Sequence, residues 1–224
     1  MKKFIVIPAY NEEKVIKRVI SDLKEHNYEN IIVVDDCSKD NTSKIALKQG
    51  AVVLNHIVNR GQGAAIKTGI DYSLKKDADI IITFDADGQH RAEDIESLIK
   101  PIKKGEADIC LGSRFLDNRS NVPLYKKVVL KCGIYVIRAM YGIKLTDVHN
   151  GLRAMNRKAA KKIEIKSNRM EHASEILEEI KKKKLRYKEI PVVIRYTDYS
   201  KKKGQSSWNA LKIFLKMMIK KIVD

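Results

Sequence analysis

The chain has 224 residues, and its content of 44% hydrophobic and 33% charged residues is typical of a globular protein. Its 45 Lys and Arg against 28 Asp and Glu give a net charge of +17, which favours a nucleic acid, an anionic membrane surface or a phosphorylated substrate as partner. Aromatic residues make up only 6% and are not interleaved with the basic ones. We therefore expect no nucleic acid partner and keep nucleic-acid binding as a remote alternative that rests on charge alone.

The cysteines and the apolar runs argue against other classes. Cys37, Cys110 and Cys132 are odd in number and form no C-x-x-C pair, which favours reduced thiols over a disulfide scaffold or a zinc site. The N-terminal apolar run is too short for a signal peptide, and no run reaches the roughly 18 residues of a transmembrane helix. We therefore expect a cytoplasmic protein.

Strands and helices alternate through the first half of the chain. The predicted strands cover residues 3–8, 31–34, 51–54, 80–85 and 108–112. Four helices are predicted between these strands. The first opens at Glu12–Glu13, and the second runs from Ser38 or Asp40 as N-cap to about Gln49. The third follows the stretch Asn59–Ala64 and ends near Lys75, and the fourth covers residues 92–100. Such an alternation predicts an α/β fold with a parallel sheet covered by helices.

The pattern changes after residue 114. The predicted elements are then helices over 124–141, 172–183 and 208–222, a loop over 146–155 that enters a short strand, an extended segment over 185–196, and a basic loop over 200–207. Pro191 places the extended segment at a sheet edge or a bulge, because proline cannot donate to a central ladder.

Polar clusters follow three of the predicted strands: Tyr10-Asn11-Glu12, Asp35-Asp36 and Asp85-x-Asp87. The carboxyl ends of parallel strands meet at one crevice, where open α/β sheets bind ligands. On extended backbone, residues i and i+2 project the same way, so Asp85 and Asp87 could hold one divalent cation between them. The open positions of that cation could take diphosphate oxygens.

Two common phosphate-binding patterns are missing. No G-x-G-x-x-G follows the first strand and no G-x-x-x-x-G-K-[ST] occurs, so a metal ion is the natural means of holding a diphosphate here. Asp36 could then accept from a base N–H group, and Glu12 from ribose hydroxyls. Helix capping is the alternative for Asp35 and Asp40, and it is favoured for Asp40.

Six motifs follow one another along the chain: Pro8-Ala9-Tyr10-Asn11-Glu12, Val34-Asp35-Asp36-x-Ser38-x-Asp40-x-Thr42, Asn59-x-Gly61-x-Gly63-Ala64, Asp85-Ala86-Asp87-Gly88-Gln89-His90, Gly112-Ser113-Arg114 and Asp147-x-x-x-Gly151-x-Arg153-Ala154. This series closely resembles the family 2 inverting glycosyltransferases of the GT-A fold, and within them the dolichol-phosphate mannose synthase-like group. The resemblance is strong over residues 3–155 and looser over 170–207. It is specific for the superfamily and poorly specific for the donor sugar and the acceptor.

The resemblance implies a mostly parallel central sheet flanked by helices. It also implies a GT-A catalytic domain over residues 1–200, with a nucleotide-sugar-binding half (1–114) and an acceptor-binding half (115–200). Residues 201–224 would then form a basic loop and a C-terminal amphipathic helix.

The resemblance also assigns roles to single residues. The nucleotide-sugar donor would contact Pro8, Tyr10, Glu12, Asp36, Gly63, Asp85, Ala86 and Lys202. Mg²⁺ or Mn²⁺ would be bound by Asp85, Asp87 and Gln89. The catalytic set would be Asp87, Arg114, Asp147 and Arg153, with Arg114 on an acceptor phosphate or the leaving diphosphate. Lys202 belongs to the basic loop Lys201–Ser206, which would close over the donor.

The acceptor decides the mechanism. A lipid phosphate is already anionic, whereas a sugar hydroxyl needs a general base within reach, for which the candidates are Asp147 and Glu175, followed by His149 and His172. Arg114 and Arg153 favour an anionic acceptor, because guanidinium groups bind phosphate in a bidentate way. We therefore predict transfer of a hexose from a UDP- or GDP-sugar to polyprenyl or dolichyl phosphate. The alternative is transfer to a glycan hydroxyl in cell-surface polysaccharide or glycolipid assembly.

The predicted last helix has an apolar face and a row of lysines, Lys212, Lys216 and Lys220. This pattern fits a helix lying on an anionic membrane surface and equally a terminal helix packed on the protein core. A lipid acceptor requires access to the bilayer, so we expect a peripheral location at the cytoplasmic face of the membrane.

Overall fold

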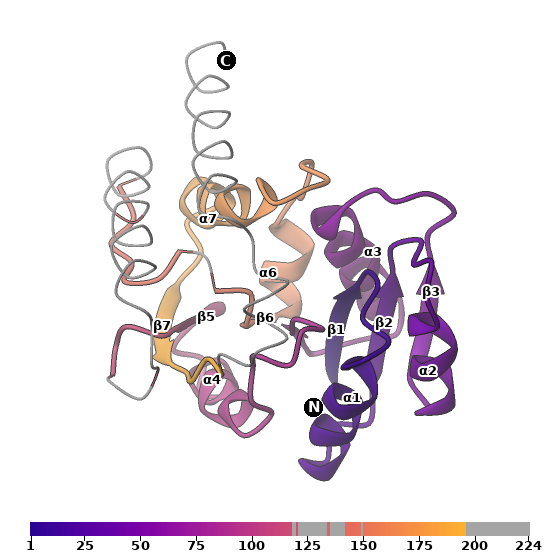
Figure 1. The fold of residues 1–224 in the computed structure, drawn as a ribbon. Coiled ribbons are helices and arrows are strands. Elements are labelled where there is room, and N and C mark those ends of the chain that lie inside the picture. The colour runs from indigo at the N-terminus through magenta and orange to yellow at the C-terminus, as the bar shows by residue number, and fades with distance from the viewer. Residues whose placement is uncertain (118–119, 121–133, 135–141, 149, 196–224) are drawn as a thin grey trace.

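The structure, a computed structural model, describes residues 1–117, 120, 134, 142–148 and 150–195 (Figure 1). The helices predicted over 124–141 and 208–222 and the basic loop with Lys202 lie outside the described residues, as does His149.

Seven strands of the described chain form one sheet in the order β3-β2-β1-β4-β6-β5-β7. They are β1 (Lys3–Ala9), β2 (Ile31–Asp35), β3 (Val52–Asn55), β4 (Ile80–Thr83), β5 (Ile109–Ser113), β6 (Arg153–Asn156) and β7 (Tyr187–Pro191). All pairs are parallel except those of β6, which runs antiparallel between β4 and β5. The predicted mostly parallel sheet is confirmed.

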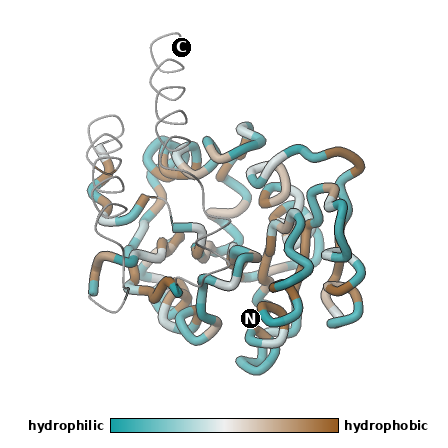
Figure 2. The backbone as a smooth tube through the Cα atoms, in the orientation of Figure 1, coloured by the Kyte–Doolittle hydropathy of each residue, from teal (hydrophilic) through white to brown (hydrophobic). Residues whose placement is uncertain are grey.

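Helices cover both faces of the sheet. They are α1 (Ile16–Glu25), α2 (Thr42–Lys48), α3 (Gln62–Lys75), α4 (Asp94–Lys103), α6 (Arg157–Lys162) and α7 (His172–Lys182). Alternate residues of β1 enter two separate cores: Ile5 and Ile7 pack with α1, α2 and α4, while Phe4 and Val6 pack with α3, α6 and α7. The inner strands are accordingly hydrophobic on both sides, as parallel strands are when both faces are covered (Figure 2).

Three boundary predictions were wrong. The strand predicted over 80–85 ends at Thr83, α1 begins at Ile16 and not at Glu12, and α2 is capped by Asn41 without a side-chain hydrogen bond. Both predicted caps have partners outside α2, although Asp40 also bonds to Thr42, the first residue of the helix. Asp40 accepts from the backbone N–H groups of Thr42 and Glu13, and the Ser38 hydroxyl donates to Asp35.

In the second half of the chain, one prediction about strand β7 is confirmed and helix α6 is new. Among the described strands β7 pairs with β5 alone, at the end of the sheet order, which confirms that Pro191 lies on an edge strand. The short helix α6 was not predicted. It is capped by the side chain of Asn156, which accepts from the Ala159 N–H at 2.7 Å.

Candidate active site

The three polar clusters after β1, β2 and β4 lie together at the carboxyl edge of the sheet. Ala9 is paired with Asp35, the N–H of Asp36 donates to the Ala9 carbonyl at 2.9 Å, and the N–H of Phe84 donates to the Val6 carbonyl. Pro8 is buried in β1, while Tyr10 beyond it is 41% exposed. The strand ends therefore lie side by side at one edge of the sheet, with buried strand residues before them and an exposed aromatic ring just beyond β1.

Asp36 organises the loop that leads into α3. Its carboxylate accepts from the backbone N–H groups of Arg60 (2.9 Å) and Gly61 (2.6 Å) and is paired with His56 Nδ1 (2.7 Å). Gly61 has φ +103°, which glycine adopts without strain. A nucleotide base that bonds to Asp36 would thus meet a carboxylate already fixed in position by its own loop.

Asp85 is held from two sides by residues to which the sequence assigned no role. Its carboxylate accepts from Gln62 Nε2 at 3.0 Å, at the first residue of α3, and is paired with His90 Nε2 at 2.9 Å. Burial raises the pKa of Asp85, but the hydrogen bond and charge of His90, together with the charges of His172 and Arg153, outweigh it and lower the pKa. A side chain at Gly151 would collide with this carboxylate, so glycine is required there.

Asp87 lies in the turn after β4, two residues beyond Asp85. Burial, the charge of Asp85 and, less strongly, that of Glu12 raise the pKa of Asp87 to about 6. Its carboxylate accepts from the Gln89 backbone N–H at 3.0 Å. Because β4 ends at Thr83, this turn, and not the pleat of a strand, brings the two acids together.

These residues fit a divalent cation. Within the described ranges no three His, Cys, Asp or Glu side chains gather into a complete metal cage. Mg²⁺, however, is usually held by one or two carboxylates together with waters and substrate phosphates. Asp85 and Asp87 supply two negative charges at a partly buried position, and the Gln89 amide adds a neutral oxygen on the same turn.

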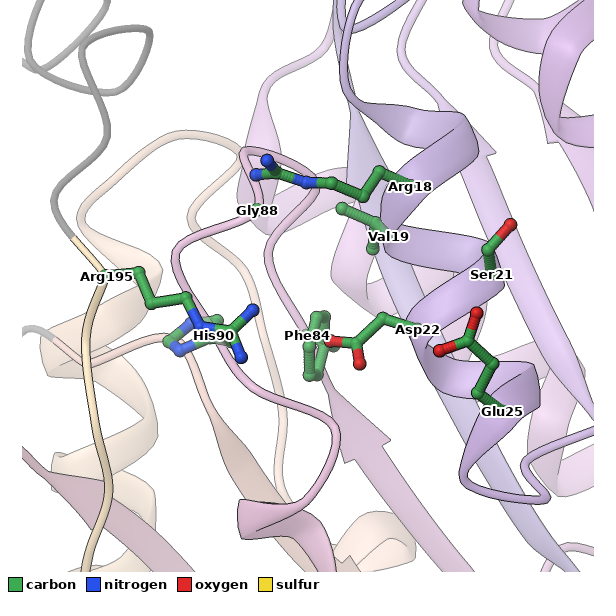
Figure 3. Close-up of a pocket in the computed structure, with 9 residues that line it drawn as sticks. All are labelled: Arg18, Val19, Ser21, Asp22, Glu25, Phe84, Gly88, His90 and Arg195. Carbon is green, nitrogen blue, oxygen red and sulfur yellow. The ribbon is translucent and has the colours of Figure 1, made fainter.

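The back of this turn borders a hollow of about 190 Å³ (Figure 3). His90 is 4% exposed, packs its ring edge-on against Phe84, and has a buried Nδ1 atom without a hydrogen-bond partner among the described groups. Arg18 reaches toward Gly88 from α1, and Arg195 enters from the segment after β7 (Figure 3). The Arg195 N–H also donates to the Gln89 carbonyl at 2.9 Å, so this segment supports the turn from behind.

Arg114, directly after β5, forms a largely buried pair with Asp147. Asp147 accepts from Arg114 Nε at 2.5 Å and from the Arg114 backbone N–H at 3.1 Å, and their side chains are 1% and 11% exposed. The sequence offered Asp147 as a candidate general base. In the structure its carboxylate orients Arg114.

Arg153 lies on β6 between two acids. Its Nε donates to the Asn150 carbonyl at 3.2 Å, and its side chain is buried. Burial lowers the pKa of Arg153 to about 10, while the charges of Asp85 and Asp147 raise it. Arg153 is therefore protonated at neutral pH and places a positive charge between the two acids.

The two other described candidates for a general base are engaged in structure. Glu175 accepts from the backbone N–H groups of Lys166 and Ser167, at 3.0 and 2.8 Å. His172 is bonded through Nδ1 to the Arg169 carbonyl, and burial, helped by the charge of Arg153, lowers the pKa of His172 to about 4.

The loop held by Glu175 packs against the start of α3. The Ala64 N–H donates to the Asn168 carbonyl, and a side chain at Gly63 would strike the Ser167 carbonyl and His172. Gly63 therefore allows the start of α3 to pack closely against the loop that contains Ser167. Ala86, the remaining predicted donor contact, is buried in the turn that carries Asp87.

Comparisons with known proteins agree with the series of motifs. The model of a family described as Glycosyl transferase family 2 matches residues 4–164. A UDP-N-acetylglucosamine–dolichyl-phosphate N-acetylglucosaminyltransferase of Methanococcus voltae is 38% identical, over 98% of this chain and 96% of its own length. A dolichol-phosphate mannosyltransferase of Pyrococcus furiosus is 32% identical, over 97% of this chain and 64% of its own length.

The fold has solved counterparts as well. Glucosyl-3-phosphoglycerate synthase of Mycobacterium tuberculosis, in complex with Mn²⁺, UDP-glucose and phosphoglyceric acid, superposes with a TM-score of 0.73 at 19% identity. The match covers 96% of this chain and 79% of that one. At this identity the likeness shows the fold, and it confirms the predicted GT-A architecture.

Proposed function

Because this chain belongs to glycosyltransferase family 2, we propose that it transfers a hexose from a UDP- or GDP-sugar to a polyprenyl phosphate with inversion and with the help of a divalent cation. The observation that carries the proposal is the pair of guanidinium groups near Asp147: the largely buried Arg114, which bonds to it, and the buried Arg153, which is also close to Asp85. Two relatives that match nearly all of this chain are named for transfer to dolichyl phosphate, which supports the same acceptor class.

The donor would lie across the carboxyl ends of β1, β2 and β4. Pro8, Tyr10, Glu12 and Asp36 would surround the nucleotide, and Asp85, Asp87 and Gln89 would hold the cation. When bound, Mg²⁺ or Mn²⁺ supplies positive charge to the diphosphate as it leaves. His90 and Gln62 keep Asp85 in place for this role through their hydrogen bonds.

The acceptor phosphate would lie against Arg114 and Arg153. An ionised phosphate oxygen attacks the anomeric carbon without losing a proton, so the reaction needs no general base. This agrees with the engagement of Asp147 and Glu175 in hydrogen bonds to the protein itself. Fixed positive charges also stabilise the negative charge that develops during transfer.

None of the helices that the structure describes is long and apolar enough to cross a membrane. We propose that the enzyme meets its lipid acceptor at the membrane surface. The basic helices predicted over 124–141 and 208–222 are the segments proposed for this contact.

The proposal is tested by a donor and acceptor screen read out by product mass. UDP- and GDP-sugars are supplied with Mg²⁺ or Mn²⁺ and a short polyprenyl phosphate, and the expected product is the lipid phosphate plus one hexose. The same donors are offered with glycan acceptors that carry no phosphate. Glycosylation of a glycan hydroxyl without turnover of the lipid phosphate would contradict the proposed acceptor.

A further inference from the structure

Glu189 on β7 is a partly buried carboxylate outside the catalytic residues discussed so far. It accepts from the Thr146 N–H at 2.8 and 2.9 Å through its two oxygens, from the Thr146 hydroxyl at 3.0 Å, and from the Asp147 N–H at 3.0 Å. Three donor groups of two consecutive loop residues therefore converge on one carboxylate. These bonds join Glu189 to the residues that precede and include Asp147, the partner of Arg114.

The loop that Glu189 holds is the one that orients Arg114. The Thr146 hydroxyl donates a hydrogen bond to Glu189. It accepts one from the Ser113 hydroxyl, with 2.7 Å between the two oxygens. Ser113 is the last residue of β5 and directly precedes Arg114, whose Nε and N–H bond to Asp147. β5 and β7 are paired in parallel, so Glu189 lies at a fixed register beside this loop.

We propose that Glu189 is a positioning residue for acceptor binding, which acts through Asp147 on the guanidinium of Arg114. The inference rests on the proposed function, in which Arg114 binds the acceptor phosphate. A bidentate contact with phosphate depends on the orientation of the guanidinium plane, and the Nε bond to Asp147 sets that plane. Asp147 can serve as a fixed anchor because its own N–H is held by Glu189.

The carboxylate form of residue 189 is essential to this role. Both of its oxygens accept from the loop, and glutamine would replace one of them by an NH₂ group facing the Thr146 N–H. Glu189→Gln therefore preserves size and can keep one acceptor oxygen, but it places an NH₂ group against the Thr146 N–H and removes the negative charge, which weakens the hold on the loop. The effect on Arg114 is indirect and should change acceptor binding without changing donor binding.

The first experiment measures KM and kcat for donor and for polyprenyl phosphate separately. Glu189→Gln is expected to raise the acceptor KM by about tenfold and to change the donor KM by less than about twofold. The matched control is Glu106→Gln, which removes the exposed ion pair with Lys188, the neighbour of Glu189 on the same strand. The control is expected to leave both KM values unchanged.

A double-mutant cycle separates positioning from a general structural role. If Glu189 acts through Arg114, the double variant Arg114→Ala/Glu189→Gln has the same acceptor KM as Arg114→Ala alone. If the two substitutions instead raise the acceptor KM independently, so that their factors multiply in the double variant, the proposal is overturned. It is also overturned if Glu189→Gln raises the donor KM as much as the acceptor KM. A lowered Tm of Glu189→Gln with an unchanged acceptor KM would also overturn it, since it assigns Glu189 to stability only.

The kinetics of the wild-type enzyme and of Glu189→Gln together separate a failure of the positioning role from a failure of the proposed function. A wild-type enzyme that glycosylates a glycan hydroxyl and not the lipid phosphate refutes the proposed function, and the inference with it. A wild-type enzyme that uses the lipid phosphate, together with Glu189→Gln kinetics equal to wild type, refutes the positioning role alone.

Discussion

At the scale of single residues, the turn after β4 brings two carboxylates together at a partly buried position. Burial and the neighbouring Asp85 raise the pKa of Asp87 to about 6, while His90 lowers the pKa of Asp85. Strongly perturbed acids in a crevice are typical of functional sites. A cation bound together with a diphosphate would balance the two carboxylates, and this is the role proposed for them.

Replacing Asp87 tests that role directly. We expect Asp87→Asn to lower kcat/KM by at least about 100-fold, because the cation loses one of its two charged ligands at the point where the diphosphate leaves. The measurement is product formation at saturating Mg²⁺ or Mn²⁺.

The control for this variant is Asp71→Asn, which removes an exposed carboxylate paired with Lys67 on α3 and should retain full activity. Wild-type activity of Asp87→Asn would remove Asp87 from the proposed metal site.

At the scale of elements, β6 determines how the two halves of the sheet meet. It is inserted antiparallel between β4 and β5, with Ala154 paired to both Ile82 and Cys110. This places Arg153 opposite Thr83 and next to the turn with the two acids.

A cluster around Asp108 links β5 to β7. Asp108 directly precedes β5 and accepts from the backbone N–H, Nε and Nη2 of Arg186 and from the Asn156 side chain.

The Asp108 cluster makes stability depend on pH. The hydrogen bonds from Arg186 hold the pKa of Asp108 well below its usual range, so its contribution is complete above the pKa of an unfolded Asp, about 4, and is lost as the pH falls further. We expect Asp108→Asn to lower the free energy of unfolding by about 2 kcal/mol at pH 7, measured by urea denaturation. The difference from wild type should shrink below about pH 4.

The control for the cluster is again Glu106→Gln, whose carboxylate pairs with Lys188 at the surface of the same sheet edge. Exposed pairs contribute little, so its unfolding curve should stay close to wild type. A difference between Asp108→Asn and wild type that stays constant from pH 7 to pH 3 would contradict the proposed ionisation of Asp108.

At the scale of the whole molecule, the net charge of +17 remains to be accounted for. Much of it lies in the second half of the chain, after β5. An enzyme whose acceptor is a lipid phosphate must bind where that lipid is, and basic segments are attracted to anionic leaflets by about 1 kcal/mol per Lys near the surface. The charge therefore agrees with peripheral membrane binding, which stays a prediction.

Vesicle sedimentation checks the prediction. The full chain should bind vesicles that contain phosphatidylserine, bind vesicles of phosphatidylcholine weakly, and be released by salt as screening increases. The combined change Lys212→Glu, Lys216→Glu and Lys220→Glu should weaken binding while leaving turnover of a short, soluble acceptor unchanged. Equal binding of this variant and the wild type would favour the alternative in which the last helix packs on the core.

The sequence by itself determined the family, the fold class and the location of the acids at strand ends. These properties depend on local patterns: apolar runs of strand length, the polar residues that directly follow them, and short motifs in a fixed order. Asp36, Asp85 and Asp87 could be placed in one crevice because parallel strands all end at the same edge of the sheet. None of this requires knowing which side chains touch.

Only the tertiary structure decided the partners. Arg114 and Asp147 are 33 residues apart in the chain, and Thr146 and Glu189 are 43 apart, so no local pattern links them. The structure paired Asp147 with Arg114, showed that Glu175 on α7 accepts from the loop before it, and showed that His90 and Gln62 hold Asp85. Hydrogen bonds between distant segments depend on sheet register and on the antiparallel insertion of β6, which are properties of the folded chain as a whole.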